Sequence, residues 1–313
     1  MTTPINTLAN SHNYVIKESV PNKLEALLSI DQKEAVKLLE EVSLSEKWNH
    51  LLNGQAKIQA PHDLEWLDTQ NWWNLKNPNE NTVVLDIGSG NGAYLSQMQE
   101  HCLDKKFISV EKNDRYISQC NERNINCSYE DIEIIKHNHP PCYDIITLRL
   151  VLQHLKQPIN AIQNAVGRLK PGGVLFIIDS YDPVRNESHQ SIQMQGLQER
   201  LKIQMQNQNK NREFSFEFYK NQTLNPDPQI NILYSNINTE GKLTGFNPIF
   251  SEEHERTTHF NNMLLISSIF KEQFHIDTID LEAMHQEFKS LLKEESYWVQ
   301  YGVHYLVLQK TPE

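Results

Sequence analysis

Positive charge is scarce in this chain, where 29 lysines and arginines face 40 aspartates and glutamates and the net charge is −11. Such a balance disfavours a non-specific grip on phosphate backbones or anionic membranes, so we expect neither nucleic acid nor a membrane as partner. Cysteine is scarce too: the 4 present form no Cys-x-x-Cys pair. Free thiols are typical of a reducing compartment, which predicts a cytoplasmic protein.

Long apolar runs are also missing. No segment approaches the roughly 18 apolar residues of a membrane-spanning helix, and the start, MTTPINTLANSHNY, lacks the basic and apolar regions of a signal peptide. The 313 residues suffice for a sizeable core, but the hydrophobic fraction of 38% is low. Abundant Asn and Gln therefore predict that part of the chain is a polar insertion or cap.

The most informative stretch is Val83–Gly92, which reads VVLDIGSGNG. Its apolar start predicts a buried strand, and its glycines predict a tight turn that a ligand can approach closely. The pattern becomes helical from Ala93, so the turn would direct the N–H groups of a helix N-terminus at that ligand. The stretch is predicted to be a cofactor loop.

Strands and helical patterns alternate from this loop onward. The expected strands are Val83–Ile87, Phe107–Val110, Cys127–Tyr129, Tyr143–Leu148 and Val174–Ile178, with further strands near Phe274–Leu281 and at Tyr301–Leu308. This order predicts an α/β fold with a doubly wound, mostly parallel, seven-stranded sheet.

Segments outside the alternating region divide the rest of the chain. Residues 1–80 are predicted to form an α-helical N-terminal cap, with one helix ended by Gly54 and another started at Pro61. Residues 81–182 would form the cofactor-binding core, and 183–260 an inserted cap around the substrate, with a partly disordered polar loop as the alternative. Residues 261–313 would complete the sheet.

Two cofactors fit the glycine loop. Gly88, Gly90 and Ala93 match the dinucleotide pattern GxGxx[GA], and Glu111 lies about where that pattern has its ribose carboxylate. An NAD-dependent oxidoreductase is therefore one hypothesis. Asp86 points the other way, because a carboxylate at this strand end would repel a pyrophosphate but suits a cofactor with a cationic amine.

An acidic residue also follows the third expected strand. The pair Asp131-Ile132 combines a hydrogen-bond acceptor for an exocyclic amine with an apolar side chain for a ring, which suits an adenine. Carboxylates at the ends of consecutive strands lie on the edge of the sheet where ligands of α/β folds bind. This favours a nucleoside cofactor that also carries an amine.

Taken in order, these motifs with YDIITLRLVLQHL and LKPGGVLFIIDS make the chain resemble class I S-adenosylmethionine-dependent methyltransferases of the small-molecule type, with their Rossmann-like fold. The resemblance covers 81–182 well and 261–313 loosely. It implies methyl transfer to an O, N or S nucleophile of a small molecule. A catalytically silent binding or scaffold protein of the same fold is a further alternative.

The resemblance also implies roles for individual residues. Asp86 would receive the cofactor's amine, and the backbone of Leu148 would face that amine. Glu111 would hold both ribose hydroxyls. The remaining cofactor-binding residues would be Gly88, Ser89 and Gly90 against the methionyl part, and Lys112, Asp131 and Ile132 around the adenine.

Arg149 follows the fourth expected strand, and three partners are open to it: the methionyl carboxylate, an acidic substrate or a nearby aspartate. The catalytic residue is not assigned. The candidates for a general base are His154, Asp182, Tyr14 and Tyr181, and for His154 a structural role as a hydrogen-bonded helix-start histidine is favoured.

One further cluster has loose metal-like spacing. It consists of His137, His139 and Cys142 in a loop with two prolines. A second pair of ligands is missing from the sequence around it, so we predict no metal site.

Overall fold

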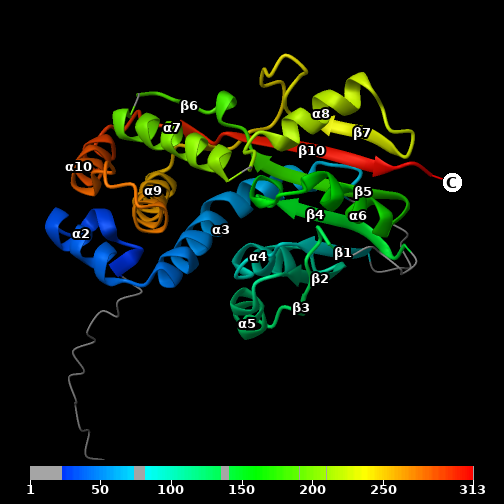
Figure 1. The fold of residues 1–313 in the computed structure, drawn as a ribbon, viewed down its shortest axis with the longest axis horizontal. Helices are drawn as coiled ribbons and strands as arrows, with labels where there is room; N and C mark the ends of the chain where they lie inside the picture. The colour runs from blue at the N-terminus through cyan, green and yellow to red at the C-terminus, as the bar shows by residue number, and fades with distance from the viewer. Residues whose placement is uncertain (1–22, 74–81, 135–140, 190, 209, 313) are drawn as a thin grey trace, which may run out of the picture.

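The computed structural model describes residues 23–73, 82–134, 141–189, 191–208 and 210–312. It has a twisted sheet flanked by helices and, at one end of that sheet, a cap of further helices (Figure 1). Tyr14, His137 and His139 lie outside the described residues.

The main sheet contains seven strands in the order β3-β2-β1-β4-β5-β10-β7. Their bounds are β1 (Thr82–Ile87), β2 (Lys105–Glu111), β3 (Cys127–Tyr129), β4 (Tyr143–Arg149), β5 (Leu169–Ser180), β7 (Ile230–Ser235) and β10 (Val303–Lys310). The first five pair in parallel, and β10 runs antiparallel to both β5 and β7. The predicted doubly wound, mostly parallel sheet is confirmed, and its strand order reverses between β1 and β4, where ligands bind in such folds.

The prediction of a strand near Phe274–Leu281 is wrong. Phe274 ends helix α9 (Glu253–Phe274) and Leu281 begins helix α10 (Leu281–Leu291). The apolar residues between them pack into the cap instead, where Ile279 is only 2% exposed. The seventh strand is β7, which comes from the segment predicted as an insertion.

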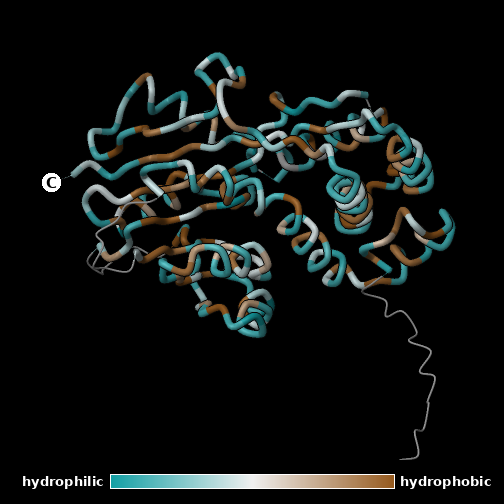
Figure 2. The backbone as a smooth tube through the Cα atoms, turned by 180° about the vertical axis from the view of Figure 1, so that it is seen from behind, coloured by the Kyte–Doolittle hydropathy of each residue, from teal (hydrophilic) through white to brown (hydrophobic). Residues whose placement is uncertain are grey.

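Two apolar cores cover the two faces of the sheet. Neighbouring residues of β1 alternate between them, with Val84 in one core and Leu85 in the other, as the pleat of a strand requires. The helices over these faces are α4 (Ala93–His101), α5 (Asp114–Glu122), α6 (Pro158–Arg168) and α8 (Phe214–Leu224). Hydrophobic residues accordingly concentrate along the strands, and the outer loops are hydrophilic (Figure 2).

The cap has a core of its own, built from segments that are far apart in the chain. Its helices are α2 (Gln32–Glu41), α3 (Leu44–Asp68), α7 (Ile192–Asn207), α9 and α10. Strands β6 (Asn186–Glu187), β9 (Val299–Gln300) and β8 (Ile249–Phe250) form a small sheet beside them. The predicted boundary between residues 260 and 261 falls inside α9, so the last part of the chain builds the cap as well as the sheet.

Helix α3 connects the cap to the sheet (Figure 1). It runs without a break through Gly54 and Pro61, so the predicted interruptions there are wrong. A Cβ atom at Gly54 would lie 2.1 Å from Oδ1 of Asn262, which shows that the glycine lets α3 pack closely against α9. Ser43 and Glu46 form a capping box that starts the helix.

A buried carboxylate near the end of α3 joins this helix to the sheet. Asp63 is 1% exposed and accepts hydrogen bonds from the Tyr94 hydroxyl at 2.8 Å and the Tyr305 hydroxyl at 2.5 Å. Its Oδ2 atom also lies 3.5 Å from Nε of Arg149, whose Nη2 donates to Gln59. Burial raises the pKa of Asp63, and Arg149 and the tyrosine hydroxyls oppose that rise. The cluster holds α3, α4, β4 and β10 together.

Replacing Asp63 by alanine is expected to lower the free energy of unfolding by about 3–5 kcal/mol, because it leaves Arg149 buried without its counter-charge. Denaturant unfolding measures the change. The matched control is Glu41→Ala, which removes an exposed carboxylate 3.6 Å from Lys37 and should cost less than about 0.5 kcal/mol. Equal losses in the two variants would contradict a structural role for the cluster.

Candidate active site

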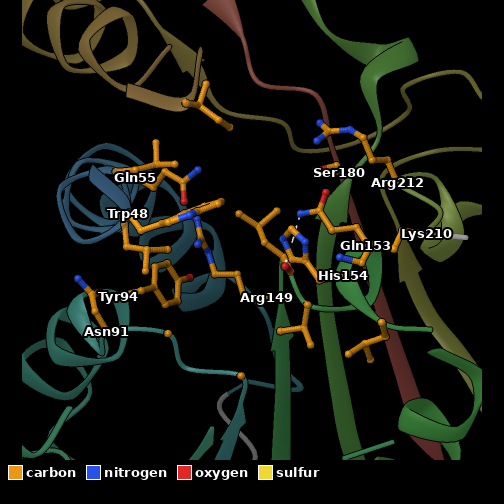
Figure 3. Close-up of a pocket in the computed structure, with 18 of the residues that line it drawn as sticks. Trp48, Gln55, Asn91, Tyr94, Arg149, Gln153, His154, Ser180, Lys210 and Arg212 are labelled. Atoms are coloured by element: carbon orange, nitrogen blue, oxygen red, sulfur yellow. Dashed lines mark hydrogen bonds between the residues drawn. The ribbon is translucent and has the colours of Figure 1, made fainter. Parts of the chain in front are cut away.

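A cavity of about 890 Å³ lies between the carboxyl ends of β1, β2, β4 and β5 and the cap helices α3, α7 and α9. Figure 3 shows side chains from both parts of the molecule entering it. Its volume is near the upper end of the range for small-ligand sites, roughly 300–1,000 Å³. The cavity therefore has room for a cofactor at the strand ends and a second molecule under the cap.

The glycine loop forms the floor of the cofactor side. Gly88 and Gly90 have φ angles of +75° and +56°, in the left-handed region that favours glycine. A Cβ atom at Gly88 would lie 2.7 Å from Val151, and one at Gly90 would lie 3.3 Å from Leu52 of α3. Both glycines are thus required by the turn and by the side chains packed over it, and not only by a ligand.

Asp86 lines the cavity at the end of β1 and is 5% exposed. The Thr147 hydroxyl donates a hydrogen bond of 2.6 Å to its Oδ1, and burial raises the pKa of the carboxyl. Within the described residues no cationic side chain lies within 4.0 Å of it. Arg149, beyond ion-pair distance, partly opposes the rise of that pKa. A buried carboxylate that lines a cavity without an ion-pair partner suits the cationic amine of a ligand.

Glu111 lines the cavity at the end of β2. Its oxygens accept hydrogen bonds from the backbone N–H groups of Gly90 at 3.0 Å, Lys112 at 2.8 Å and Asn113 at 3.0 Å. Burial raises the pKa of this carboxyl and the three N–H groups oppose the rise. A carboxylate has about four acceptor positions, so the side chain holds the loop and keeps capacity for a ligand hydroxyl.

The other predicted cofactor residues divide between the cavity wall and the core. Ser89, Lys112, Asp131 and Ile132 line the cavity with Asp86, the glycines and Glu111. Leu148 is fully buried in β4 between β1 and β5 and is not part of the cavity wall. The wall continues instead with Arg149 and Leu150.

The sequence leaves three partners open for Arg149, and the structure pairs it with an aspartate, Asp63. Besides its contact with Asp63, its guanidinium carbon lies 4.1 Å from the centre of the Tyr94 ring, in cation–π geometry. Arg149 also lines the cavity, where Figure 3 shows it beside Tyr94 and Gln55. Asp63 of α3 therefore balances the charge of Arg149, and Arg149 can still contact a ligand in the cavity.

For His154 the sequence favours a structural histidine satisfied by a hydrogen bond, and the described part of the chain provides no such partner for its ring. Its ring is exposed into the cavity and has no side-chain hydrogen bond there. Burial among protein atoms, with the nearby cations Lys210, Arg212 and Lys112, lowers the pKa of His154 to about 4. The ring is therefore neutral at pH 7.

The other candidate bases are placed differently. Asp182 lines the cavity, but both of its oxygens accept hydrogen bonds from Arg212 at 3.1 Å. Tyr181 is 5% exposed, packs on Phe216 with ring centres 4.6 Å apart, and does not line the cavity.

Gln153 and Ser180 line the cavity on the acceptor side and share a buried anchor. Asp179, which is fully buried, accepts hydrogen bonds from the N–H of Gln153 at 3.1 Å and from that of Ser180 at 3.0 Å. Burial raises the pKa of Asp179 to about 7. Gln153 belongs to the VLQHL motif beside His154, so the sequence did contain a signal for it.

Further cavity residues have no motif that could have identified them. They are Trp48 and Gln55 of α3, Arg185 after the short helix η3 (Asp182–Val184), His259 of α9, and Tyr301. They meet only because the cap folds over the sheet.

No group of three or more metal-binding side chains occurs among the described residues, which include Cys142 but neither His137 nor His139. The same part of the chain has no helix that is long and apolar enough to cross a membrane.

Asp179 predicts a specific pH dependence. Its carboxyl keeps its proton up to about pH 7 in the folded protein, against an ordinary value of 3.8, so its burial costs stability as the pH rises between these values. Asp179→Asn does not titrate and should gain stability relative to the unchanged protein, by up to about 4 kcal/mol between pH 4 and pH 8. Parallel urea unfolding at both pH values measures the gap, and a constant gap would contradict the shift.

Comparison with known proteins matches residues 78–298 to a family described as a methyltransferase domain. A tRNA U34 carboxymethyltransferase of Helicobacter pylori is 30% identical over 169 residues, which are 49% of this chain and 63% of that protein. A ubiquinone biosynthesis O-methyltransferase of Coxiella burnetii is 33% identical over 100 residues, which are 30% of this chain and 41% of that protein. The chain thus spans less than two thirds of either relative.

Solved structures with a similar chain course include a plantazolicin methyltransferase in complex with SAH, with a TM-score of 0.49, 16% identity and coverage of 93% of this chain and 95% of that one. A putative sarcosine dimethylglycine methyltransferase of Galdieria sulphuraria has a TM-score of 0.47 and 13% identity, covering 80% of this chain and 84% of that one. The family match extends over more than half of the sequence and includes every strand-end residue described above. The chain belongs to the methyltransferase-domain family.

Proposed function

We propose that this protein transfers a methyl group from S-adenosylmethionine to an O, N or S nucleophile of a small molecule. The observation that carries the proposal is the continuous cavity of about 890 Å³, which joins the strand-end carboxylates to a space roofed by α3, α7 and α9. A small acceptor in that space would lie next to the cofactor and beneath the cap.

On the cofactor side, the chemistry of each side chain fits one part of the donor. Asp86 has no ion-pair partner within the described residues and would pair with the amine, while the Gly88–Gly90 backbone would lie against the methionyl part. Glu111 would accept from the ribose, and Asp131 and Ile132 would bind the adenine. Arg149, at the wall between the two halves, would lie near the methionyl carboxylate.

When bound, S-adenosylmethionine supplies a methyl group that the positive sulfur already activates. The protein's contribution is then to align the acceptor and to exclude water. The cap supplies apolar side chains for both tasks, among them Leu51 and Leu52 of α3 and Met263 and Ile266 of α9. Trp48 and Gln55 complete this wall opposite His154 and Ser180 (Figure 3).

His154 would contact the acceptor as a neutral ring. With a pKa of about 4 it accepts a hydrogen bond at pH 7 but is a weak base toward an ordinary hydroxyl. The catalytic residue itself is left unassigned.

A nucleic-acid acceptor is the alternative that the Helicobacter relatives' name raises. The net charge of −11 and the cap over the acceptor side both favour a small molecule. All 4 cysteines are free, which supports a reducing compartment such as the cytoplasm.

Cofactor binding tests the assignment of Glu111. Glu111→Ala removes the ribose acceptor and the anchor of the Gly90 loop, so the affinity for S-adenosylhomocysteine should fall by roughly 10- to 100-fold. Isothermal titration calorimetry measures it, with Glu100→Ala on the exposed side of α4 as the control. An unchanged affinity, or binding of NAD in place of S-adenosylhomocysteine, would sink the assignment.

Acceptor class is tested by following a label. The protein is incubated with methyl-labelled S-adenosylmethionine and either a cell extract filtered to retain only small molecules or purified total tRNA. We expect label in the small-molecule arm, measured by mass spectrometry, and its loss in Glu111→Ala. Label in tRNA alone would refute the small-molecule acceptor.

A further inference from the structure

Two cap residues at the acceptor side of the cavity have polar atoms that the protein leaves unused. Arg185 follows η3, and His259 lies on the facing helix α9; both line the cavity. Within the described part of the chain, Nη2 of Arg185 and Nε2 of His259 are buried without any hydrogen-bond partner. Such groups lose their water without a compensating hydrogen bond, which destabilises the protein unless a ligand supplies one.

Arg185 is held in this position by the backbone around it. A Cβ atom at Gly302 would lie 3.0 Å from Cβ of Arg185, so a larger residue at 302 would crowd the arginine at its Cβ. Within the described residues its guanidinium forms no ion pair closer than 4.0 Å. Arg185 therefore lines the cavity with its Nη2 atom covered by protein atoms, and no carboxylate of the described residues pairs with its charge.

The carboxylates next to Arg185 in the chain are already engaged. Asp182 pairs with Arg212 through both oxygens at 3.1 Å. Glu187 accepts a hydrogen bond of 2.8 Å from the Tyr297 hydroxyl and one of 3.2 Å from the N–H of Ser191. An additional anion for Arg185 would thus have to come from a ligand.

His259 is suited to share that anion. His259 is only 2% exposed. Its burial and the nearby Arg185 lower the pKa of the imidazole to about 3. The neutral ring can carry its proton on Nε2 and donate it, while the arginine donates from Nη2. A bound anion between the two would satisfy both atoms at once.

We propose that Arg185 and His259 form a binding subsite for a carboxylate group of the methyl acceptor. The proposal rests on the proposed function, because it assigns this end of the cavity to the acceptor. A carboxylate matches the pair since it offers oxygens to both donors and a charge to the guanidinium. The neighbouring Met194 and Leu197 of α7 and Met263 of α9 are apolar, so the acceptor would carry its carboxylate on an apolar body.

The test compares carboxylates with their neutral counterparts. The full-length protein is titrated by calorimetry with straight-chain C4–C12 and phenylalkanoic carboxylates, each paired with its own primary amide, both with and without saturating S-adenosylhomocysteine. We expect carboxylates of the panel to bind at least roughly tenfold more tightly than their amides. A panel in which no carboxylate exceeds its amide overturns the proposal.

Variants assign the preference to the subsite. Arg185→Gln and His259→Gln should each reduce the carboxylate preference about tenfold and leave the affinity for S-adenosylhomocysteine unchanged. Arg115→Gln, which removes an exposed arginine outside the cavity wall, is the matched control. A preference that survives in Arg185→Gln overturns the proposal.

The two proposals fail in different ways. Absence of S-adenosylhomocysteine binding in the unchanged protein would count against the proposed function, whereas the carboxylate arm without that ligand still tests the subsite. Normal S-adenosylhomocysteine binding without a carboxylate preference would reject the subsite and leave the proposed function standing.

Discussion

The buried Asp63 carboxylate is the contact on which the relation between cap and sheet depends. It belongs to α3, yet its hydrogen-bond donors come from α4 and β10, and its counter-charge comes from Arg149 at the end of β4. Because a buried charge is stable only with good partners, the cluster permits one position of α3 over the strand ends. The same helix places Leu52 over Gly90 and Trp48 in the cavity wall. The Asp63 cluster thus helps to position the helix that lines the cavity both at the glycine loop and beneath the cap.

Features of the fold and the site that depend on neighbouring residues could be predicted from the sequence, whereas those that depend on contacts between distant segments could not. The glycine loop, the acidic strand ends and the parallel strands have local patterns, and the structure has them where the sequence predicts them. The sequence predicts breaks in α3 at Gly54 and Pro61 because both residue types have low helix propensity. In the structure the helix is continuous, and Gly54 allows its close contact with Asn262. Apolar residues at 274–281 indicated a strand but pack into a cap core that the sequence alone does not reveal.

The site residues without a motif have a common physical reason. Arg185 and His259 belong to no motif in their own segments. Only the folded cap brings both residues to the cavity and buries Nη2 and Nε2 without a hydrogen-bond partner among the described residues. Arg149 shows the intermediate case, since the sequence limited its partners to three classes and only the fold selected Asp63. The cavity that results is lined by carboxylates at the strand ends, Asp86 and Glu111, and by side chains such as Arg185 and His259 that reach it from the cap.

Strand β7 has a consequence for how this fold tolerates change. It forms the edge of the main sheet and, among the strands of the described residues, pairs with β10 alone, although it lies between two segments of the cap in the chain. A shortened protein without residues 183–260 would therefore expose the backbone groups of β10 along its whole outer side. Unpaired edges of this kind promote association between copies. The segment that builds part of the cap therefore also protects the sheet edge, and its removal would alter solubility.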